Sequence, residues 1–229
     1  IGISMVTAIT TPQDQVEKGH HLLQTGAYSE AARWYLKAAR QGDAEGQYQM
    51  GMLYLRGWGV VDDRDEAEAY FLLAAHQNHP QAVNMLGELR LDAADYANAK
   101  AFFERAVNLG NITALANLGY LYEQGKGVEK DLALAEKNYK KAAKKKDPRA
   151  YQLLADWYSK QGKKKWSEVV KYTTLAAKGG NEVSMKVLGW MYRYSQYGVK
   201  YDAKESAYWY KKAEQYNNPH NYVDIGVFY

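Results

Sequence analysis

The feature that most constrains this chain is a residue frame that recurs every 32 to 37 residues. The clearest copy lies between residues 114 and 143, where an apolar stretch, a glycine loop and a second apolar stretch follow one another. A small residue anchors each copy: Gly19, Gly51, Gly87, Gly119, Ala155, Gly189 and Gly226. A period near 34 residues is typical of stacked helix–turn–helix units, none of which can bury its own apolar face alone.

The copy around Gly119 shows why each unit is a pair of helices. Its first part carries apolar residues at helical spacing: Leu115, Leu118, Leu121 and Tyr122. Gly125 and Gly127 then end the helix, because glycine adopts positive φ without steric cost. Asp131 favours the start of a new helix. The second apolar stripe consists of Leu132, Ala135, Tyr139, Ala142 and Ala143.

The four prolines test this frame independently. Pro12, Pro80, Pro148 and Pro219 all lie seven residues before an anchor. Proline is favoured at the first position of a helix, particularly after a residue that caps the helix. The residues at the capping position are Thr11, Asp43, His79, Asn111, Asp147, Asn181 and Asn218. The frame therefore predicts an all-α, right-handed solenoid of about six helix pairs followed by a terminal helix.

The stretch from Ala114 to Ala143 resembles a Sel1-like repeat, a relative of the tetratricopeptide repeat. Three units carry the glycine loop of that family, at residues 57–60, 125–128 and, more loosely, 197–199. Units with short turns near Gly26, Ala94 and Lys164 look more like tetratricopeptide units. The resemblance covers roughly residues 12 to 229, and it implies an interaction scaffold without identifying the partner.

The domain boundaries follow from the same frame. Residues 1–11 are uncharged over their length and are interpreted as a strap, the end of a processed leader or added residues. Residues 12–229 are predicted to form one repeat domain. Its units are 12–42, 43–78, 79–109, 110–146, 147–180 and 181–217, with a terminal helix at 218–229.

The charge of the chain is uneven. Residues 1–110 hold nine Lys and Arg against fourteen Asp and Glu, a net charge of −5, whereas residues 111–229 carry +9. Much of the excess lies at Lys144–Lys146 and Lys163–Lys165. Such a block suits an acidic protein or an anionic membrane surface, or it is simply a solvated helix face. Nucleic acid is disfavoured as a partner, since no recognised nucleic-acid-binding module is present.

The sequence lacks the residue patterns of catalysis and metal binding. There is no cysteine, which excludes disulfides and thiol chemistry. His76 and His79 have no third ligand at a suitable spacing, so no metal site is predicted. No phosphate-binding loop or nucleophile motif is present. We therefore predict no catalytic residue, no cofactor and no enzymatic activity.

The surface of the first helices is the remaining candidate for function. Positions three before and one after each anchor point away from the apolar stripe, because successive residues turn by about 100°. The candidate protein-binding residues are Tyr48, Met52, Asn84, Glu88, Tyr120, Gln152, Asp156, Lys186 and Trp190, with Trp58 added at a loop tip. In stacked helix pairs these positions are expected to line the concave side. Aromatic residues there suit contacts that carry most of the binding energy.

Three hypotheses of function follow from this surface. The first is a non-enzymatic adaptor, bacterial in origin, that binds a protein segment on its concave face. The second is an immunity protein that inhibits a secreted toxin, a role that some Sel1-like proteins have. The third is a hydrolase whose site has no recognised motif. The resemblance favours a periplasmic or secreted protein over a cytoplasmic one.

Overall fold

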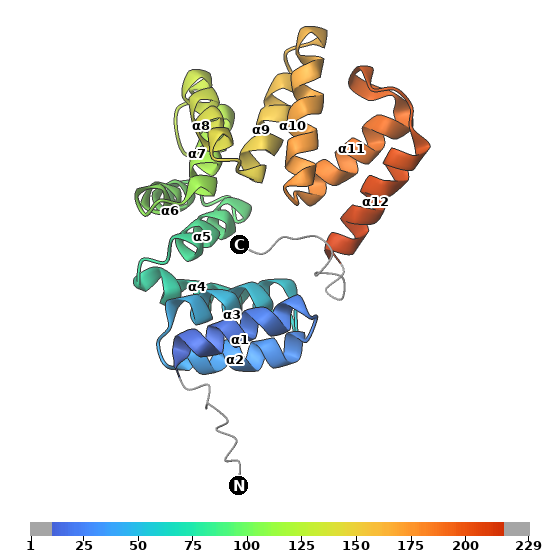
Figure 1. The fold of residues 1–229 in the computed structure, drawn as a ribbon. Helices are drawn as coiled ribbons and strands as arrows, with labels where there is room; N and C mark the ends of the chain where they lie inside the picture. The colour runs from blue at the N-terminus through green and yellow to red at the C-terminus, as the bar shows by residue number, and fades with distance from the viewer. Residues whose placement is uncertain (1–10, 218–229) are drawn as a thin grey trace. The chain divides into compact units, whose positions relative to one another are not determined.

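The computed structural model describes residues 11–217, and this part of the chain is helical without a strand (Figure 1). The α-helices are α1 (Pro12–Gln24), α2 (Tyr28–Arg40), α3 (Ala44–Arg56), α4 (Arg64–His76), α5 (Pro80–Asp92), α6 (Tyr96–Asn108), α7 (Ile112–Gln124), α8 (Leu132–Lys144), α9 (Pro148–Ser159), α10 (Trp166–Lys178), α11 (Glu182–Tyr194) and α12 (Ala203–Asn217). Two 3₁₀ turns, η1 (Lys163–Lys165) and η2 (Gln196–Gly198), precede α10 and α12. The predicted all-α fold of about six helix pairs is confirmed.

Consecutive helices pack as pairs, and contacts between neighbouring pairs join α2 to α3, α6 to α7, α8 to α9 and α10 to α11. We number them as repeats, from repeat 1 (α1 and α2) to repeat 6 (α11 and α12). The chain forms two compact units, one ending at Val83 and the other beginning at Asn84, so α5 belongs partly to each. The single domain predicted for residues 12–229 stays a prediction. The predicted N-terminal strap and terminal helix fall mainly on residues 1–10 and 218–229, outside the described residues.

The predicted capping residues begin the first helices. A side-chain oxygen of Thr11, Asp43, Asn111, Asp147 or Asn181 accepts a hydrogen bond from a main-chain N–H in the first turn. His79 does the same for α5 with its ring, whose Nδ1 accepts from the N–H of Ala82 over 3.2 Å. These contacts satisfy donors that the first turn of a helix leaves unpaired. Short polar residues in the repeat frame therefore fix where each first helix starts.

The glycine loops end α3 and α7 as predicted. Gly57 and Gly125 both adopt the left-handed conformation, with φ of 68° and 63°. The loop after α3 folds back on α2, so Trp58 is only 8% exposed and its ring lies 5.9 Å from that of Tyr28. The prediction that Trp58 forms an exposed contact at a loop tip is therefore wrong. Leu132 was also misplaced, since it is exposed at the start of α8 instead of lying in the apolar stripe.

The anchors mark the closest approach of the two helices in a pair. A methyl group added to Gly51 would lie 2.6 Å from the ring of Phe71, and one added to Gly119 would lie 2.7 Å from the ring of Tyr139. Each ring lies on the second helix of its pair, at the position that Tyr139 occupies four residues before Ala143. We name this position the ring position. Its occupants in repeats 1 to 4 are Tyr35, Phe71, Phe103 and Tyr139, all fully buried. Glycine and ring together close the interior of each of these four pairs.

Candidate functional site

Repeat 5 departs from this glycine–ring arrangement. Its anchor is Ala155, where the other described repeats have glycine, and its ring position holds Thr173. Repeat 6 returns to the pattern with Gly189 and Tyr210, although Tyr210 is only partly buried. Threonine cannot fill the space that a phenylalanine or tyrosine ring fills in the other pairs. The interior of repeat 5 is therefore open to one side.

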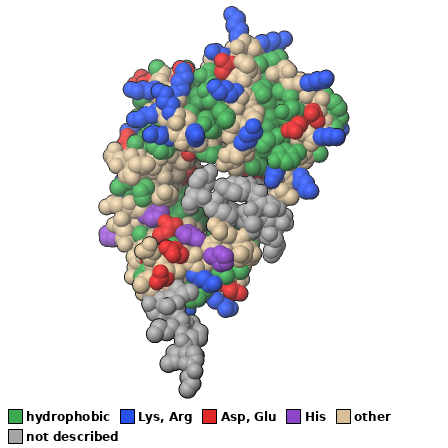
Figure 2. Space-filling view, in the orientation of Figure 1, with side chains coloured by type: hydrophobic (Ala, Val, Ile, Leu, Met, Phe, Trp, Pro, Cys, Tyr) green, Lys and Arg blue, Asp and Glu red, His purple; other side chains and the backbone are tan. Residues whose placement is uncertain are grey.

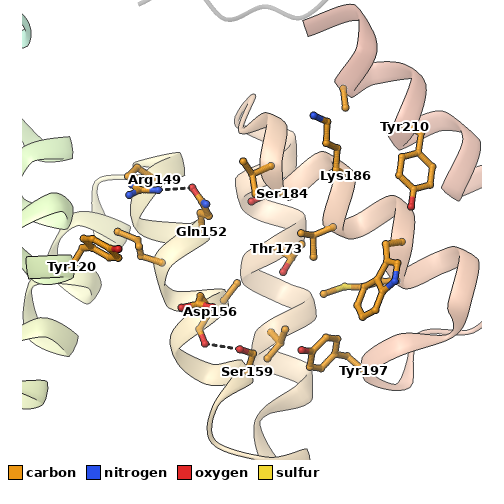
Figure 3. Close-up of a pocket in the computed structure, with 18 of the residues that line it drawn as sticks. Tyr120, Arg149, Gln152, Asp156, Ser159, Thr173, Ser184, Lys186, Tyr197 and Tyr210 are labelled. Carbon is orange, nitrogen blue, oxygen red and sulfur yellow. Dashed lines mark hydrogen bonds between the residues drawn. The ribbon is translucent and has the colours of Figure 1, made fainter. Parts of the chain in front are cut away.

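A groove of about 890 Å³ lies at this opening. It is lined by side chains from α7, α9, α10, α11, η2 and α12, all within the second compact unit, and Figure 3 shows these side chains around one shared space. Ala155 and Thr173 both belong to the lining. The apolar lining includes Leu153, Val169, Val183, Val187, Trp190 and Met191. We name this the repeat-5 groove.

Half of the residues predicted from the sequence meet in the repeat-5 groove. They are Tyr120, Gln152, Asp156, Lys186 and Trp190. Trp190 is 39% exposed, and its ring lies 6.5 Å from that of Tyr197, which lines the same groove. The register of the first helices therefore brought residues from repeats 4, 5 and 6 to one place, as the frame predicts.

A chain of hydrogen bonds leads from α5 to this groove. Asn117 Nδ2 donates to Asn84 Oδ1 over 3.0 Å, and Arg149 Nε donates to Asn117 Oδ1 over 3.4 Å. Arg149 Nη1 and Asn181 Nδ2 then both donate to Gln152 Oε1, over 3.0 Å and 2.9 Å. The side chains of four successive first helices are thus connected. We name this set the polar ladder.

The polar ladder also supplies the hydrogen-bond partners of Glu88 and influences its pKa. Its Oε1 accepts hydrogen bonds from Asn84 and Asn117, over 3.0 Å and 3.2 Å. Burial raises the pKa of Glu88, although these two bonds and the charge of Arg149 act in the opposite direction. Asn84 is buried and bonded within the ladder. The expectation that Asn84 is an exposed contact residue is therefore corrected. Asn84 instead joins the first helices α5 and α7 through its bond with Asn117.

Three polar side chains of the groove, Gln152, Thr173 and Ser184, carry polar groups without a hydrogen-bond partner among the described residues. Because Gln152 Oε1 accepts from two donors, its amide N–H groups are the part left to bond elsewhere, and they have no partner among residues 11–217. Thr173 and Ser184 are 2% and 3% exposed, and their hydroxyls likewise lack a partner among the described residues. All three residues line the groove and are visible in Figure 3. Their unpaired polar atoms face the open space of the groove, so they are free to form hydrogen bonds with a molecule bound there.

Two of the charged groups that line the groove, Asp156 and Lys186, form ion pairs. Lys160 Nζ lies 2.8 Å from Asp156 Oδ2 and 2.9 Å from Glu123 Oε1. Burial disfavours the charge of Lys160, but the hydrogen bonds to the two carboxylates outweigh it and raise the pKa of the lysine. Lys186 pairs with Glu182 on α11. The other two charged residues of the lining are Arg149, which bonds to the side-chain amides of Asn117 and Gln152, and Glu214, so most of the lining is apolar or neutral and hydrogen-bonding.

The remaining predicted residues lie in the first unit or within the core. Tyr48 stacks on His79 with 4.8 Å between ring centroids, and it also contacts the ring of Phe71. Met52 is partly exposed on α3. His79 Nε2 lies 2.7 Å from Glu45 Oε2, and His20 Nε2 lies 4.0 Å from the other oxygen of Glu45. Tyr48 and Met52 are thus not part of the repeat-5 groove.

The structure also bears on metal binding and membrane insertion. Within residues 11–217, no three His, Asp or Glu side chains gather closely enough to hold a metal ion. None of the helices among these residues combines the length and apolar character that a membrane span requires.

Thr173, Ser184 and Arg149 line the groove but were not predicted from the sequence. The signal for Thr173 was present, since alignment of the frame gives a ring at 35, 71, 103, 139 and 210 but threonine at 173. Ser184 and Arg149 stand in the first turns of α11 and α9, where no periodic pattern separates a groove residue from an ordinary polar one. The break in the repeat at Thr173 is thus the one sequence signal that marks the groove.

Five segments of the chain match the model of the Sel1 repeat: residues 17–43, 44–79, 80–111, 112–147 and 183–215. The chain belongs to the Sel1 repeat family. The short-turn units around Gly26 and Ala94 lie inside matched segments, so they are Sel1 repeats with short turns. Residues 148–182, which form repeat 5, are not matched. The departure from the family pattern thus coincides with the groove.

Relatives of known structure share this architecture. A Sel1 repeat protein from Oxalobacter formigenes is 32% identical, with a TM-score of 0.70 over 92% of this chain and 88% of that one. An immunity protein from Pseudomonas aeruginosa is 20% identical, with a TM-score of 0.67 over 95% of this chain and 88% of that one. That lower identity shows a shared fold alone. The predicted solenoid class is confirmed, and Sel1 repeat proteins are protein-interaction scaffolds.

A relative known from sequence is much longer than this chain. An uncharacterised Neisseria meningitidis protein is 33% identical over 122 residues, which are 53% of this chain and 26% of that protein. The chain thus spans about a quarter of that relative's length.

Proposed function

We propose that this chain is a non-enzymatic scaffold that holds a segment of a partner protein in the repeat-5 groove. The observation that carries the proposal is the missing ring at Thr173. It opens an apolar groove where the family pattern is interrupted, and five of the residues predicted to bind a partner line it. Trp190, Tyr120 and Arg149 are residue types that commonly dominate the energy of protein interfaces.

The arrangement of the hydroxyl groups favours binding over catalysis. A catalytic hydroxyl needs an adjacent base within hydrogen-bond reach. Ser159 Oγ instead donates to the main-chain oxygen of Asp156 over 2.6 Å. Thr173 and Ser184 are buried, and no hydrogen bond joins either hydroxyl to a titratable side chain among the described residues. A hydrolase is therefore the least supported of the three hypotheses.

A double substitution that restores the family pattern provides the test. Ala155→Gly with Thr173→Phe recreates the glycine–ring pair and fills the groove from inside. We expect the variant to retain its melting temperature while it loses at least about tenfold in affinity for the partner, since a filled groove cannot bury the partner's side chains. Partners captured from cells of the source organism would be compared by quantitative mass spectrometry between wild type and variant.

The control keeps the groove and changes another apolar surface. Leu73 on α4 is 52% exposed in the first unit, so Leu73→Ala removes apolar surface of a similar kind elsewhere. Capture of the same protein in equal amounts by the filled variant and by wild type would contradict the proposal. Loss on Leu73→Ala without loss on the filled variant would move the binding surface to the first unit.

An immunity protein is the second candidate. The solved immunity protein named above matches almost the whole chain, although at an identity that supports the fold alone. In this reading the captured partner is a secreted toxin, and the groove holds part of it. Co-expression of this chain with the captured protein tests the immunity role. Wild type would protect cells from the toxin, whereas the filled variant would not. Capture of a partner that is harmless when expressed alone would leave only the adaptor role.

A further inference from the structure

The lining of the groove and the charge beside it indicate which chemistry the partner segment has. Resting on the proposed function, we propose that the repeat-5 groove binds a short peptide segment with apolar side chains that is flanked on one side by acidic residues. The apolar part occupies the groove, and the acidic flank contacts the exposed lysines of the turn between α9 and α10.

The dimensions of the groove fit a short segment of chain. Its wall on α9 runs from Arg149 to Ser159, which at about 1.5 Å per residue is roughly 15 Å. About five residues of extended chain span that length. The volume of about 890 Å³ accommodates a few large side chains of such a segment, next to Trp190 and Met191. A peptide therefore fits better than a whole helical domain.

The unpaired polar groups of the groove match a peptide backbone. The amide N–H groups of Gln152 can only donate, so they suit a main-chain carbonyl oxygen. The hydroxyls of Thr173 and Ser184 can donate or accept, so they suit either main-chain group. A purely apolar ligand would bury these groups without partners, which is costly. A peptide segment satisfies them while its side chains occupy the apolar lining.

A continuous set of aromatic contacts joins the groove to the basic turn. The ring of Tyr197, inside the groove, lies 5.7 Å from that of Trp166, and Lys163 Nζ lies 5.3 Å from the Trp166 ring. Lys164 follows directly and is exposed. Ser159, at the end of α9, also lines the groove just before this turn. The basic turn is thus an immediate continuation of the groove.

The charge of this region has few counter-charges. Residues 137–178 carry thirteen Lys and Arg against three Asp and Glu, a net charge of +10. Figure 2 shows Lys and Arg side chains beside exposed hydrophobic surface on the part of the molecule formed by α8 to α12. No ion pair is present for Lys163, Lys164 or Lys165 within the described residues, whereas Lys160 is committed to Glu123 and Asp156. An acidic flank would supply the missing counter-charges.

Selection from a displayed peptide library tests this inference. The peptides would be about twelve residues long, with about five central positions restricted to apolar and aromatic residues. One side would carry acidic, neutral or basic residues in three equally represented classes. We expect the acidic class to be enriched, and its binding to weaken as salt rises from about 0.05 M to about 0.3 M.

Three variants assign the contacts of an enriched peptide. Trp190→Ala removes an apolar contact and should weaken binding at least about tenfold. Thr173→Val removes one hydroxyl and should weaken it about fivefold. Reversal of Lys163, Lys164 and Lys165 to Glu should weaken it about tenfold or more and remove most of the salt dependence.

The matched control reverses Lys137, Lys141 and Lys144 on α8, a helix that contributes no residue to the groove. This control should change binding by less than about threefold.

The possible results separate the two proposals. Enrichment of neutral or basic flanks, still dependent on Trp190, would overturn the acidic flank and leave the groove as a binding site. Absence of enrichment relative to the filled variant Ala155→Gly with Thr173→Phe would overturn the proposed function as well. Binding of anionic lipid vesicles or single-stranded DNA that depends on Lys163–Lys165 but not on the filled groove would assign the basic turn to another partner and overturn this inference.

Discussion

Repeats 2 and 5 place different residues at equivalent positions, and the difference explains which one has a groove. In repeat 2 the first-helix residue Tyr48 stacks on His79, the capping residue of the next first helix, and Phe71 fills the interior. In repeat 5 the equivalent Gln152 bonds to Asn181, again the next capping residue, but Thr173 leaves the interior open. The residue at the ring position of the second helix therefore decides whether the interior of the pair is filled or open to a groove.

The largest effect that tests this comparison comes from the anchors. A methyl group at Gly51 would lie 2.6 Å from the fully buried ring of Phe71, whereas at Gly189 it would lie 3.1 Å from the partly exposed ring of Tyr210. We expect Gly51→Ala to lower the free energy of unfolding by about 2 kcal/mol through overpacking. Gly189→Ala should change it by less than about 0.5 kcal/mol, since Tyr210 can shift into the groove and alanine favours the helix.

Chemical denaturation of both variants, with circular dichroism as the readout, measures this difference. Equal losses at Gly51 and Gly189 would mean that the last repeat is as tightly closed as repeat 2. The comparison between closed and open pairs would then fail.

An intermediate effect is expected for the aromatic residues of the first helices. Tyr48→Ala removes a ring packed against Phe71 and His79, so we expect a loss of about 2 kcal/mol in the free energy of unfolding. Trp190→Ala removes a ring with substantial exposure, and the loss should be below about 1 kcal/mol. The same denaturation experiment ranks them. A larger loss for Trp190→Ala would make this residue part of the core.

The smallest effects concern two carboxyl groups, Glu45 in repeat 2 and Glu88 in the polar ladder. Burial raises the pKa of Glu45, but the hydrogen bonds from His79 and Gln49 and the charges of the two histidines lower it below the ordinary 4.5. A lowered pKa in the folded state means that stability is present above 4.5 and is lost as the pH falls. Burial raises the pKa of Glu88, so that carboxyl contributes in the opposite direction, with stability gained as the pH falls towards 4.5.

Glu45→Gln and Glu88→Gln separate these two contributions. Stability relative to wild type would be followed from neutral pH to about pH 3, where the two carboxyl groups become protonated. For Glu45→Gln the deficit should shrink on acidification, and for Glu88→Gln it should grow. Parallel pH dependence of both variants would show that the two sites have the same electrostatic character.

Much of the fold could be predicted because each helix carries local signals for its start and its end. Asp43, Asn111 and Asp147 cap their helices by contacts within four residues, and Gly57 and Gly125 adopt the positive φ that their loops require. The burial of Trp58 could not be predicted in this way. It depends on how the loop after α3 folds back on Tyr28, a contact between residues thirty positions apart.

The candidate site was predicted in part for a similar reason. The position of Tyr120, Gln152, Asp156, Lys186 and Trp190 follows from helical geometry and the repeat frame alone. The burial of Asn84 does not, because it depends on the side chain that the next repeat presents, Asn117. The groove itself depends on a residue of the second helix, Thr173, whereas the prediction considered only first helices.

The polar ladder has a consequence for how this array could have changed in length. Each joint that it crosses uses a different pair of partners: Asn84 with Asn117, Asn117 with Arg149, and Gln152 with Asn181. If one repeat were duplicated or lost, the new neighbours would meet with donors facing donors or with a buried amide unpaired. Such mismatches are costly in a low-dielectric interior. The repeats of the second unit are therefore similar in shape but not interchangeable. Their order is fixed by the polar side chains that pair at each joint.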